Sequence, residues 1–277
     1  MTTAKTRLCC LIGDPIEHSL SPIMFTAAFS ELKEDAVYLA FKVKKEDLKN
    51  AIDGLRAIGF LGCNVTMPHK IEVTKYLDKL EDTAKFVGSV NTIAERGGKL
   101  IGYNTDGKGV IASFENEGIE IHDKKVLIVG YGGAARSIAF EIVEKKPSEV
   151  IIAGRDASKA KMLVDLIKGR VNAYEILMGD LKKIGADIII NATPLGMRQR
   201  IEEIPIPEEL LKKDVVVLDL VYDPIETKLL QLAKEKGCKI IDGLEPLVHQ
   251  GAIAFKIWIG KDAPINIMRK AIREAIL

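Results

Sequence analysis

The chain has 277 residues, of which 47% are hydrophobic and 29% are charged, a balance typical of globular proteins and not of disordered chains. Its 40 Lys and Arg residues nearly cancel its 39 Asp and Glu residues, so no global field attracts nucleic acid or a membrane surface. The apolar runs are only strand-sized and no signal peptide precedes them, so we expect a cytoplasmic protein without a transmembrane segment. At this length two domains are more common than one.

The first part of the chain alternates between strand-like and helical stretches. Strands are predicted at 7–13, 36–43 and 60–66, and helices at 22–32 and 48–59. This alternation indicates α/β layering with a largely parallel sheet. The segments 89–96 and 99–106 flank Gly97-Gly98, which predicts a β-hairpin and therefore an antiparallel edge.

After Asp106 the alternation continues into a second predicted sheet. Its five expected strands lie at 124–130, 149–155, 186–193, 214–222 and 238–243. From Leu244 onward the sequence predicts helices, the last with Pro264 in its first turn. We expect these C-terminal helices to pack on the first domain, because the second predicted sheet is complete before they begin. We therefore predict one discontinuous domain, 1–105 with 243–277, and an inserted domain, 106–242.

The segment GYGGAAR at 130–136 lies between the apolar run KVLIV and a helical stretch. Gly130 allows a tight turn, Gly132 lets the backbone approach a pyrophosphate, and Ala135 keeps the helix near the sheet, as in G-x-G-x-x-G/A. The first N–H groups of the helix would face phosphate. Because a further strand completes a βαβ unit, the segment predicts a Rossmann-type dinucleotide-binding domain, with an ordinary tight turn as the alternative.

Cysteine and histidine residues predict neither disulfides nor a metal site. The four cysteines, Cys9, Cys10, Cys63 and Cys238, show no C-x-x-C pairing, and the four histidines form no recognisable ligand set. We expect reduced thiols and no bound metal.

Six polar segments end or interrupt the apolar runs. They are HSLSP at 18–22, NVTMPHK at 64–70, SVNT at 89–92, GYNTDG at 102–107, NATPLGM at 191–197 and QGAIAF at 250–255. Each one alone is typical of an ordinary turn. In open α/β sheets, however, ligands bind outside the carboxyl ends of the strands, where most of these segments fall.

Together with GDPIEHSLSP, DLVYDPIET and DGLEPLVHQGAIAFKIW, these motifs occur in the order and spacing of the shikimate dehydrogenase family. The chain resembles this family over essentially its whole length. The resemblance implies an N-terminal α/β substrate domain completed by C-terminal helices, and a Rossmann-type NADP-binding domain. It also implies reversible NADP-linked interconversion of 3-dehydroshikimate and shikimate, in aromatic amino acid biosynthesis, with both ligands in an interdomain cleft. We expect a monomer or a homodimer.

The resemblance assigns roles to individual residues. Lys70 and Asp106 match the catalytic pair. The positions that match shikimate contacts are Ser19, Ser21, Thr66, Asn91, Tyr222 and Gln250, the two serines lying near the carboxylate. The positions that match cofactor contacts are Gly130, Tyr131, Gly132, Gly133, Ala134, Arg155, Thr193 and Gly243. Taken alone, Lys70 could be a solvated lysine at a helix start and Asp106 a helix N-cap.

In such a reaction the cofactor supplies hydride, so the protein must position two carbons and manage one proton. Reduction of a ketone builds negative charge on oxygen, which a nearby ammonium can stabilise and protonate. Lys70 fits this role, since an ordinary lysine with a pKa of about 10.4 is charged at neutral pH. Asp106 would hold the ammonium in place and accept a hydrogen bond from the neighbouring substrate hydroxyl.

The chain departs from the family pattern in two places. The usual S-P-x-x-H-N ends here in Phe25 and Thr26, which we expect to pack in their helix. The familiar N-R-T is replaced by Gly154, Arg155 and Asp156. Arg155 favours the 2′-phosphate of NADP, whereas a carboxylate at Asp156 could bind the ribose hydroxyls of NAD. We predict NADP, with NAD as the alternative.

Two other functions remain open from the sequence. One is a quinate or quinate/shikimate dehydrogenase that uses NAD and the same catalytic pair. The other is a noncatalytic metabolite sensor, which the presence of both Lys70 and Asp106 and the lack of a DNA-binding segment disfavour.

Overall fold

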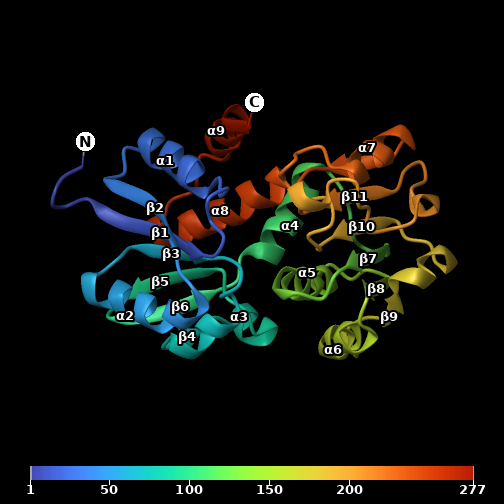
Figure 1. The fold of residues 1–277 in the computed structure, drawn as a ribbon, viewed down its shortest axis with the longest axis horizontal. Coiled ribbons are helices and arrows are strands. Elements are labelled where there is room, and N and C mark those ends of the chain that lie inside the picture. The colour runs from blue at the N-terminus through green and yellow to red at the C-terminus, as the bar shows by residue number, and fades with distance from the viewer. Residues whose placement is uncertain (1, 277) are drawn as a thin grey trace. The chain divides into compact units, whose positions relative to one another are not determined.

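The computed structural model describes residues 2–276 (Figure 1). The chain divides into two compact units: the chain up to Gly109 together with the chain from Val248 onward, and Val110–Leu247. The division points thus lie a few residues C-terminal to the predicted ones, 105/106 and 242/243. Each unit has its own sheet.

The sheet of the first unit has six strands in the order β2-β1-β3-β5-β6-β4. The strands are β1 (Arg7–Gly13), β2 (Ala36–Lys42), β3 (Gly62–Val65), β4 (Lys79–Leu80), β5 (Thr92–Arg96) and β6 (Lys99–Tyr103). Strand β1 pairs in parallel with β2 and β3, whereas β5 is antiparallel to both β3 and β6. The predicted β5–β6 hairpin is confirmed, and Gly97 and Gly98 both have positive φ, which glycine adopts without strain.

Several helices belong to the first unit wholly or in part. They are α1 (Ser21–Glu31), α2 (Leu48–Ile58), α3 (Asp82–Val87), α4 (Asp106–Asn116), α8 (Leu244–Ile259) and α9 (Ile265–Ile276). Helix α9 packs against α1, and Pro264 directly precedes α9. On α8, the Trp258 ring fills the space above Gly62, where a Cβ would lie 2.2 Å from the ring. Its indole N–H donates to the Ile93 carbonyl at 3.1 Å, so α8 is fixed to β3 and β5.

Phe25 and Thr26, the two residues of α1 that depart from the family pattern, differ in burial. Phe25 is fully buried and stacks on Tyr38 with ring centroids 4.5 Å apart, so its predicted packing role is confirmed. Thr26 is exposed, so the prediction that it packs is wrong. Because Thr26 follows Phe25 by one position in the helix, its side chain points in a different direction, away from the sheet and toward solvent.

The sheet of the second unit has six strands in the order β9-β8-β7-β10-β11-β12, and all neighbours are parallel. The strands are β7 (Lys125–Val129), β8 (Glu149–Gly154), β9 (Ala173–Leu177), β10 (Ile188–Asn191), β11 (Val216–Asp219) and β12 (Lys239–Ile241). This order is that of a Rossmann fold, whose ligand crevice opens where the order reverses, between β7 and β10. The prediction of five strands was wrong, because the half-buried side chains of β9 give no continuous apolar run.

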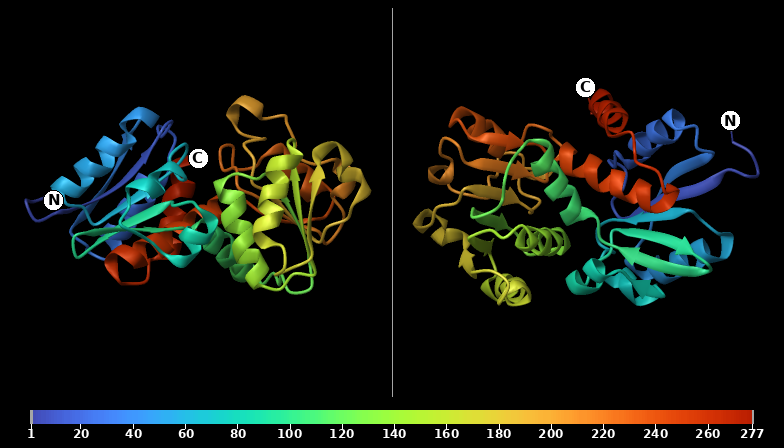
Figure 2. Two further views of the ribbon diagram at one scale, coloured as in Figure 1. Left: turned by 90° about the horizontal axis from the view of Figure 1, so that it is seen from below. Right: turned by 180° about the vertical axis from the view of Figure 1, so that it is seen from behind.

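Helices cover both faces of this second sheet (Figure 2). They are α5 (Gly133–Glu144), α6 (Ala157–Ile167) and α7 (Lys228–Glu235). Val126 and Ile128 of β7 face the core cluster under α5 and α6, while Leu127 and Val129 face the cluster under α7. Burial on both faces explains why these strands are almost wholly apolar.

Short 3₁₀ helices occur in the connections. They lie at Lys45–Asp47, Glu72–Tyr76, Met178–Lys183, Arg198–Arg200 and Glu208–Leu210. All four cysteines are free, and Cys9, Cys10 and Cys63 are buried. Each helix within residues 2–276 is too short or too polar to cross a membrane.

Candidate active site

Lys70 and Asp106 lie in direct contact in the first unit. Lys70 follows β3 in the turn NVTMPHK, and Asp106 is the first residue of α4 after β6. The Nζ atom of Lys70 donates to Oδ2 of Asp106 at 2.5 Å. Their side chains are only 23% and 16% exposed, so the pair is screened less by water than a surface ion pair. The lysine side chain is thus neither fully buried nor fully exposed.

Asn91 orients the Asp106 carboxylate from the other side. Its Nδ2 donates to Oδ1 of Asp106 at 2.7 Å and to Oγ1 of Thr105 at 2.9 Å. Its Oδ1 accepts from the Thr105 backbone N–H at 2.8 Å. The backbone N–H of Asp106 donates to Asn104 Oδ1 at 3.2 Å. Both carboxylate oxygens are therefore engaged, one by Lys70 and one by Asn91.

The remaining predicted substrate residues of the first unit lie on three segments, one of which, the turn after β3, also contains Lys70. Gln250 on α8 places Oε1 3.3 Å from Asn91 Nδ2. Thr66 directly follows β3, and its methyl group lies 2.2 Å from where a Cβ on Gly13 would stand, so glycine at the end of β1 makes room for it. At the start of α1, the Ser21 backbone N–H donates to Ser19 Oγ at 3.3 Å.

A buried polar connection that the sequence did not reveal links these segments. The Tyr38 hydroxyl on β2 donates to Asn64 Oδ1 at 2.7 Å. Asn64 Nδ2 in turn donates to the Asn91 carbonyl at 3.1 Å and to Thr92 Oγ1 at 3.0 Å. Burial raises the pKa of Tyr38 well above its ordinary value, while a hydrogen bond from the Ser21 side chain opposes the rise. The only sequence signal was a polar residue within each apolar strand.

In the second unit, Gly130 directly follows β7 and lies close to the chain that follows β10. Its φ of +120° is open to glycine and strained for other residues. A Cβ there would lie 2.8 Å from the Ala192 carbonyl oxygen and 3.3 Å from Cγ2 of Thr193. The turn after β7 and the loop after β10 therefore meet at the crevice position of the Rossmann fold.

The start of α5 fits a pyrophosphate. Gly132 is the N-cap residue and supplies no side-chain acceptor to the first turn, which contains Gly133 and Ala134. A Cβ on Gly132 would meet no atom within 4 Å, so open space lies beside the turn. First-turn N–H groups without an intrahelical partner, next to open space, are the usual setting for a bound phosphate.

Tyr131 explains one departure from the family pattern. A Cβ on Gly154, the last residue of β8, would lie 2.5 Å from the Tyr131 ring. The ring therefore occupies the place of a side chain at position 154, and glycine at the end of β8 leaves room for it. Arg155, which follows, is exposed.

Asp156 has a structural partner of its own. Its Oδ1 accepts from the backbone N–H groups of Ser158 at 3.0 Å and Lys159 at 3.2 Å, so it caps α6. These contacts and the Lys159 ammonium lower the pKa of Asp156. The carboxylate is therefore engaged by the helix, which weakens the argument that Asp156 selects NAD.

The other predicted residues of the second unit follow β10, β11 and β12. Thr193 donates from Oγ1 to Asn191 Oδ1 at 2.7 Å. Gly243 packs against the chain just before Tyr222, because a Cβ on Gly243 would lie 2.5 Å from the Val221 carbonyl oxygen. Tyr222 is half-buried, and burial together with Asp223 raises its pKa.

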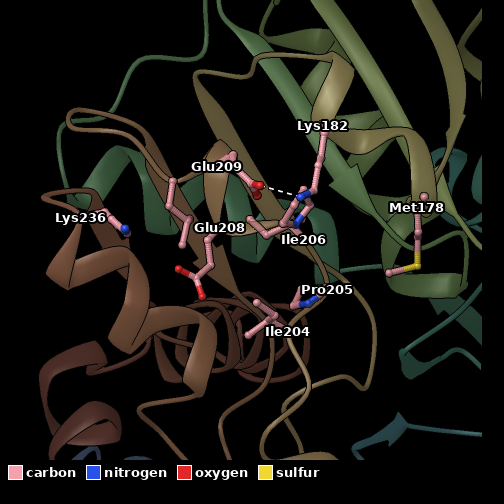
Figure 3. A pocket seen from close by; sticks show the side chains of 11 residues that line it. Met178, Lys182, Ile204, Pro205, Ile206, Glu208, Glu209 and Lys236 are labelled. Carbon is pink, nitrogen blue, oxygen red and sulfur yellow. Dashed lines mark hydrogen bonds and ion pairs between the residues drawn. The ribbon is translucent and has the colours of Figure 1, made fainter.

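A pocket of about 800 Å³ lies elsewhere in the second unit (Figure 3). Its lining residues are Met178, Gly179, Lys182, Ile204, Pro205, Ile206, Pro207, Glu208, Glu209, Leu211 and Lys236. The Lys182 ammonium lies 2.6 Å from the Glu209 carboxylate in its wall. The predicted site residues do not line this pocket, so we do not assign the active site to it.

Comparisons with known proteins identify the family of the chain. Three family models match: the shikimate dehydrogenase substrate binding domain at residues 11–93, shikimate / quinate 5-dehydrogenase at 112–242, and the shikimate 5′-dehydrogenase C-terminal domain at 243–273. The shikimate dehydrogenase (NADP(+)) of Methanocaldococcus jannaschii is 48% identical over 282 residues, covering 100% of this chain and 99% of that protein.

Solved structures give the same result. A crystal structure of a shikimate dehydrogenase in complex with NADP+ matches with a TM-score of 0.94 and 46% identity, covering 100% of this chain and 98% of that one. A quinate dehydrogenase from Corynebacterium glutamicum in complex with NAD matches with a TM-score of 0.90 and 31% identity, covering 97% and 99% of the two chains. From its motifs, its fold and these matches, the chain belongs to the shikimate dehydrogenase family.

Proposed function

We propose that this protein catalyses the reversible, NADPH-dependent reduction of 3-dehydroshikimate to shikimate in aromatic amino acid biosynthesis. The observation that carries the proposal is the 2.5 Å contact between Lys70 and Asp106, with Asn91 on the second carboxylate oxygen. Full-length relatives named for this activity and this cofactor support it. In this proposal, residues 1–105 and 243–277 bind the substrate, and residues 106–242 bind NADP.

The reaction assigns a distinct task to each residue of the pair. Bound NADPH supplies hydride to the carbonyl carbon. The Lys70 ammonium lies against the carbonyl oxygen, stabilises the negative charge that develops there and gives it a proton from Nζ. Asp106 holds Nζ in place through Oδ2, and Asn91 fixes the carboxylate. In the direction of oxidation, neutral Lys70 takes the hydroxyl proton from shikimate.

The substrate is held by hydroxyl and amide groups of several segments. Ser19 and Ser21 at the start of α1 bind the carboxylate, and the ring hydroxyls are bound by Thr66, Asn91, Tyr222 and Gln250. The contact of Gln250 with Asn91 supports this assignment, because it places the amide beside the Lys70–Asp106 pair.

Replacing Gln250 with alanine is expected to raise KM for shikimate about tenfold and to change kcat much less. A substrate hydroxyl would lose its partner, and an unmatched buried polar group costs about 1–3 kcal/mol. Steady-state kinetics check this, with Gln231→Ala as the control because Gln231 is exposed on α7. Unchanged kinetics in Gln250→Ala would show that the substrate lies elsewhere.

The cofactor is held by the turn after β7 and by residues that follow β8, β10 and β12. The residues of this set are Gly130, Tyr131, Gly132, Gly133, Ala134, Arg155, Thr193 and Gly243. The open space beside Gly132 and the cap of α5 support a pyrophosphate there. Exposed Arg155 fits a 2′-phosphate, and Asp156 is held by α6.

Replacing Arg155 with alanine is expected to raise KM for NADP about tenfold or more while leaving KM for NAD nearly unchanged. A charge-assisted hydrogen bond to phosphate contributes about 1.5–3 kcal/mol, and NAD has no phosphate at this position. Both cofactors are compared by steady-state kinetics in the wild type and in a control, Arg7→Ala, in the first unit. A wild-type preference for NAD would contradict the assignment.

A quinate or quinate/shikimate dehydrogenase that uses NAD is the second candidate. The likeness to a quinate dehydrogenase bound to NAD favours it as a specific alternative. Turnover of shikimate and quinate with both nicotinamide cofactors separates the two functions. Turnover with either substrate also excludes a noncatalytic sensor.

The protein is placed in the cytoplasm in this proposal, as a monomer or a homodimer. Four free cysteines, three of them buried, support a reducing compartment. Sedimentation analysis of the purified chain determines the oligomeric state.

A further inference from the structure

Asp219, the last residue of β11, is a fully buried carboxylate that three donors approach. Its Oδ1 accepts from Asn191 Nδ2 at 2.8 Å and from the Val221 backbone N–H at 3.0 Å. Its Oδ2 accepts from Thr227 Oγ1 at 2.7 Å. A buried carboxylate costs free energy unless such donors surround it, so the three hydrogen bonds offset part of the cost of burying Asp219.

Asn191 extends this contact to the loop after β10. It is the register partner of Asp219 in the sheet and is itself fully buried. Its Oδ1 accepts from both the backbone N–H and the hydroxyl of Thr193, at 3.0 Å and 2.7 Å. Its Nδ2 also donates to the Leu195 carbonyl at 3.1 Å. The amide thus fixes both the direction of the loop and the hydroxyl of Thr193.

Asp219 also fixes both ends of the loop after β11. Val221 binds the carboxylate at the start of the loop and Thr227 binds it at the end, where Thr227 also caps α7 through Leu230. Tyr222 lies between these two attachments. Thr193 and Tyr222 therefore belong to two loops whose backbones are both anchored to one carboxylate.

We propose that Asp219 is a positioning residue that sets the cofactor-side loop of Thr193 and the substrate-side loop of Tyr222 relative to each other. This inference rests on the proposed function, because that function gives the two loops their ligands. Asp219 touches neither ligand in this arrangement. It acts through Asn191 on one side and through Val221 and Thr227 on the other.

Two conservative variants test the proposal. Asp219→Asn keeps the shape but presents an N–H group to Thr227, and Thr227→Val removes the donor to Oδ2 together with the acceptor that caps α7. Each is expected to raise KM for both shikimate and NADP about tenfold, with a smaller change in kcat, because the loops lose an anchor and not a reacting group. Thr227→Val also covers the case in which Asp219→Asn does not fold.

The control is Val217→Ala, a buried substitution two residues earlier in β11 that lowers stability and removes none of the three hydrogen bonds to Asp219. Its KM values are expected to match the wild type. Binding of NADP and of shikimate is also measured by calorimetry, which reports on the loops even if turnover fails. Wild-type turnover tests the proposed function. Wild-type affinities for both ligands in the two loop variants would overturn the inference while leaving that function intact.

Discussion

Replacing Lys70 with alanine is expected to lower kcat by about 10²–10⁴-fold, with only a modest change in KM for shikimate. The ammonium acts mainly on charge that develops in the transition state, so its removal lowers the rate more than the affinity. Its Nζ is held 2.5 Å from the Asp106 carboxylate, so we expect no other group to replace the ammonium at this position. Steady-state and single-turnover rates with shikimate and NADP measure the effect.

Two further variants make this test specific. Lys75→Ala removes a lysine only five positions away that is 65% exposed and pairs with Glu72, and it should retain wild-type kinetics. Asp106→Asn should also lower kcat, and the double variant should lose less than the product of the two single losses, since residues that act as a unit are not additive. Near-normal turnover in Lys70→Ala would remove the mechanism.

Asp219 is expected to make the free energy of unfolding depend on pH in an unusual direction. Burial raises the pKa of Asp219 from 3.8 to about 6, against the effect of its three hydrogen bonds. Between these values the folded chain keeps a proton that the unfolded chain has lost. The stability that Asp219 contributes is therefore full below about pH 4 and is lost as the pH rises through about 6.

The difference between the wild type and Asp219→Asn isolates this effect. A rise in pKa from 3.8 to about 6 corresponds to about 3 kcal/mol. Relative to the variant, the wild type should lose about 2 kcal/mol of this between about pH 4.5 and pH 7, because the remainder is already lost below pH 4.5, as measured by urea unfolding at about pH 4.5, 5.5 and 7. Asp165→Asn, at a carboxyl that is 50% exposed, serves as a surface control. A pH-independent difference for Asp219→Asn would refute the prediction.

The continuous strands and the hairpin of the fold were predictable because their signals are local. Buried parallel strands such as β7 and β8 are apolar after their first residue, and the Gly97-Gly98 turn is encoded in two adjacent residues. Strand β9 was missed because it is paired on one side only and half-buried, so its side chains follow no clear apolar pattern. Strand β4 has only two residues, too few for any periodicity.

The residues of the site also fall into two groups: those that local motifs predict, and those that only long-range contacts reveal. The order of the motifs was enough to predict that Lys70 and Asp106 form a pair, and the two side chains are in contact in the structure. The residues that hold the site in place, such as Asn64 and Asp219, are single polar groups inside apolar strands. Their partners lie 26 or 28 positions away in the chain for the links from Asn64 to Tyr38 and from Asp219 to Asn191. Only the register of neighbouring strands reveals such pairs.

The packing of the Trp258 ring over Gly62 affects the order in which the two units can fold during synthesis on the ribosome. Residues 110–247 emerge as one uninterrupted stretch, and that unit has all its strands before the last thirty residues are translated. The N-terminal strands emerge earlier but still lack the indole that covers β3 and the α9 helix that covers α1. Because domains generally fold as units, the portion of the chain made first is the portion that completes its folding last.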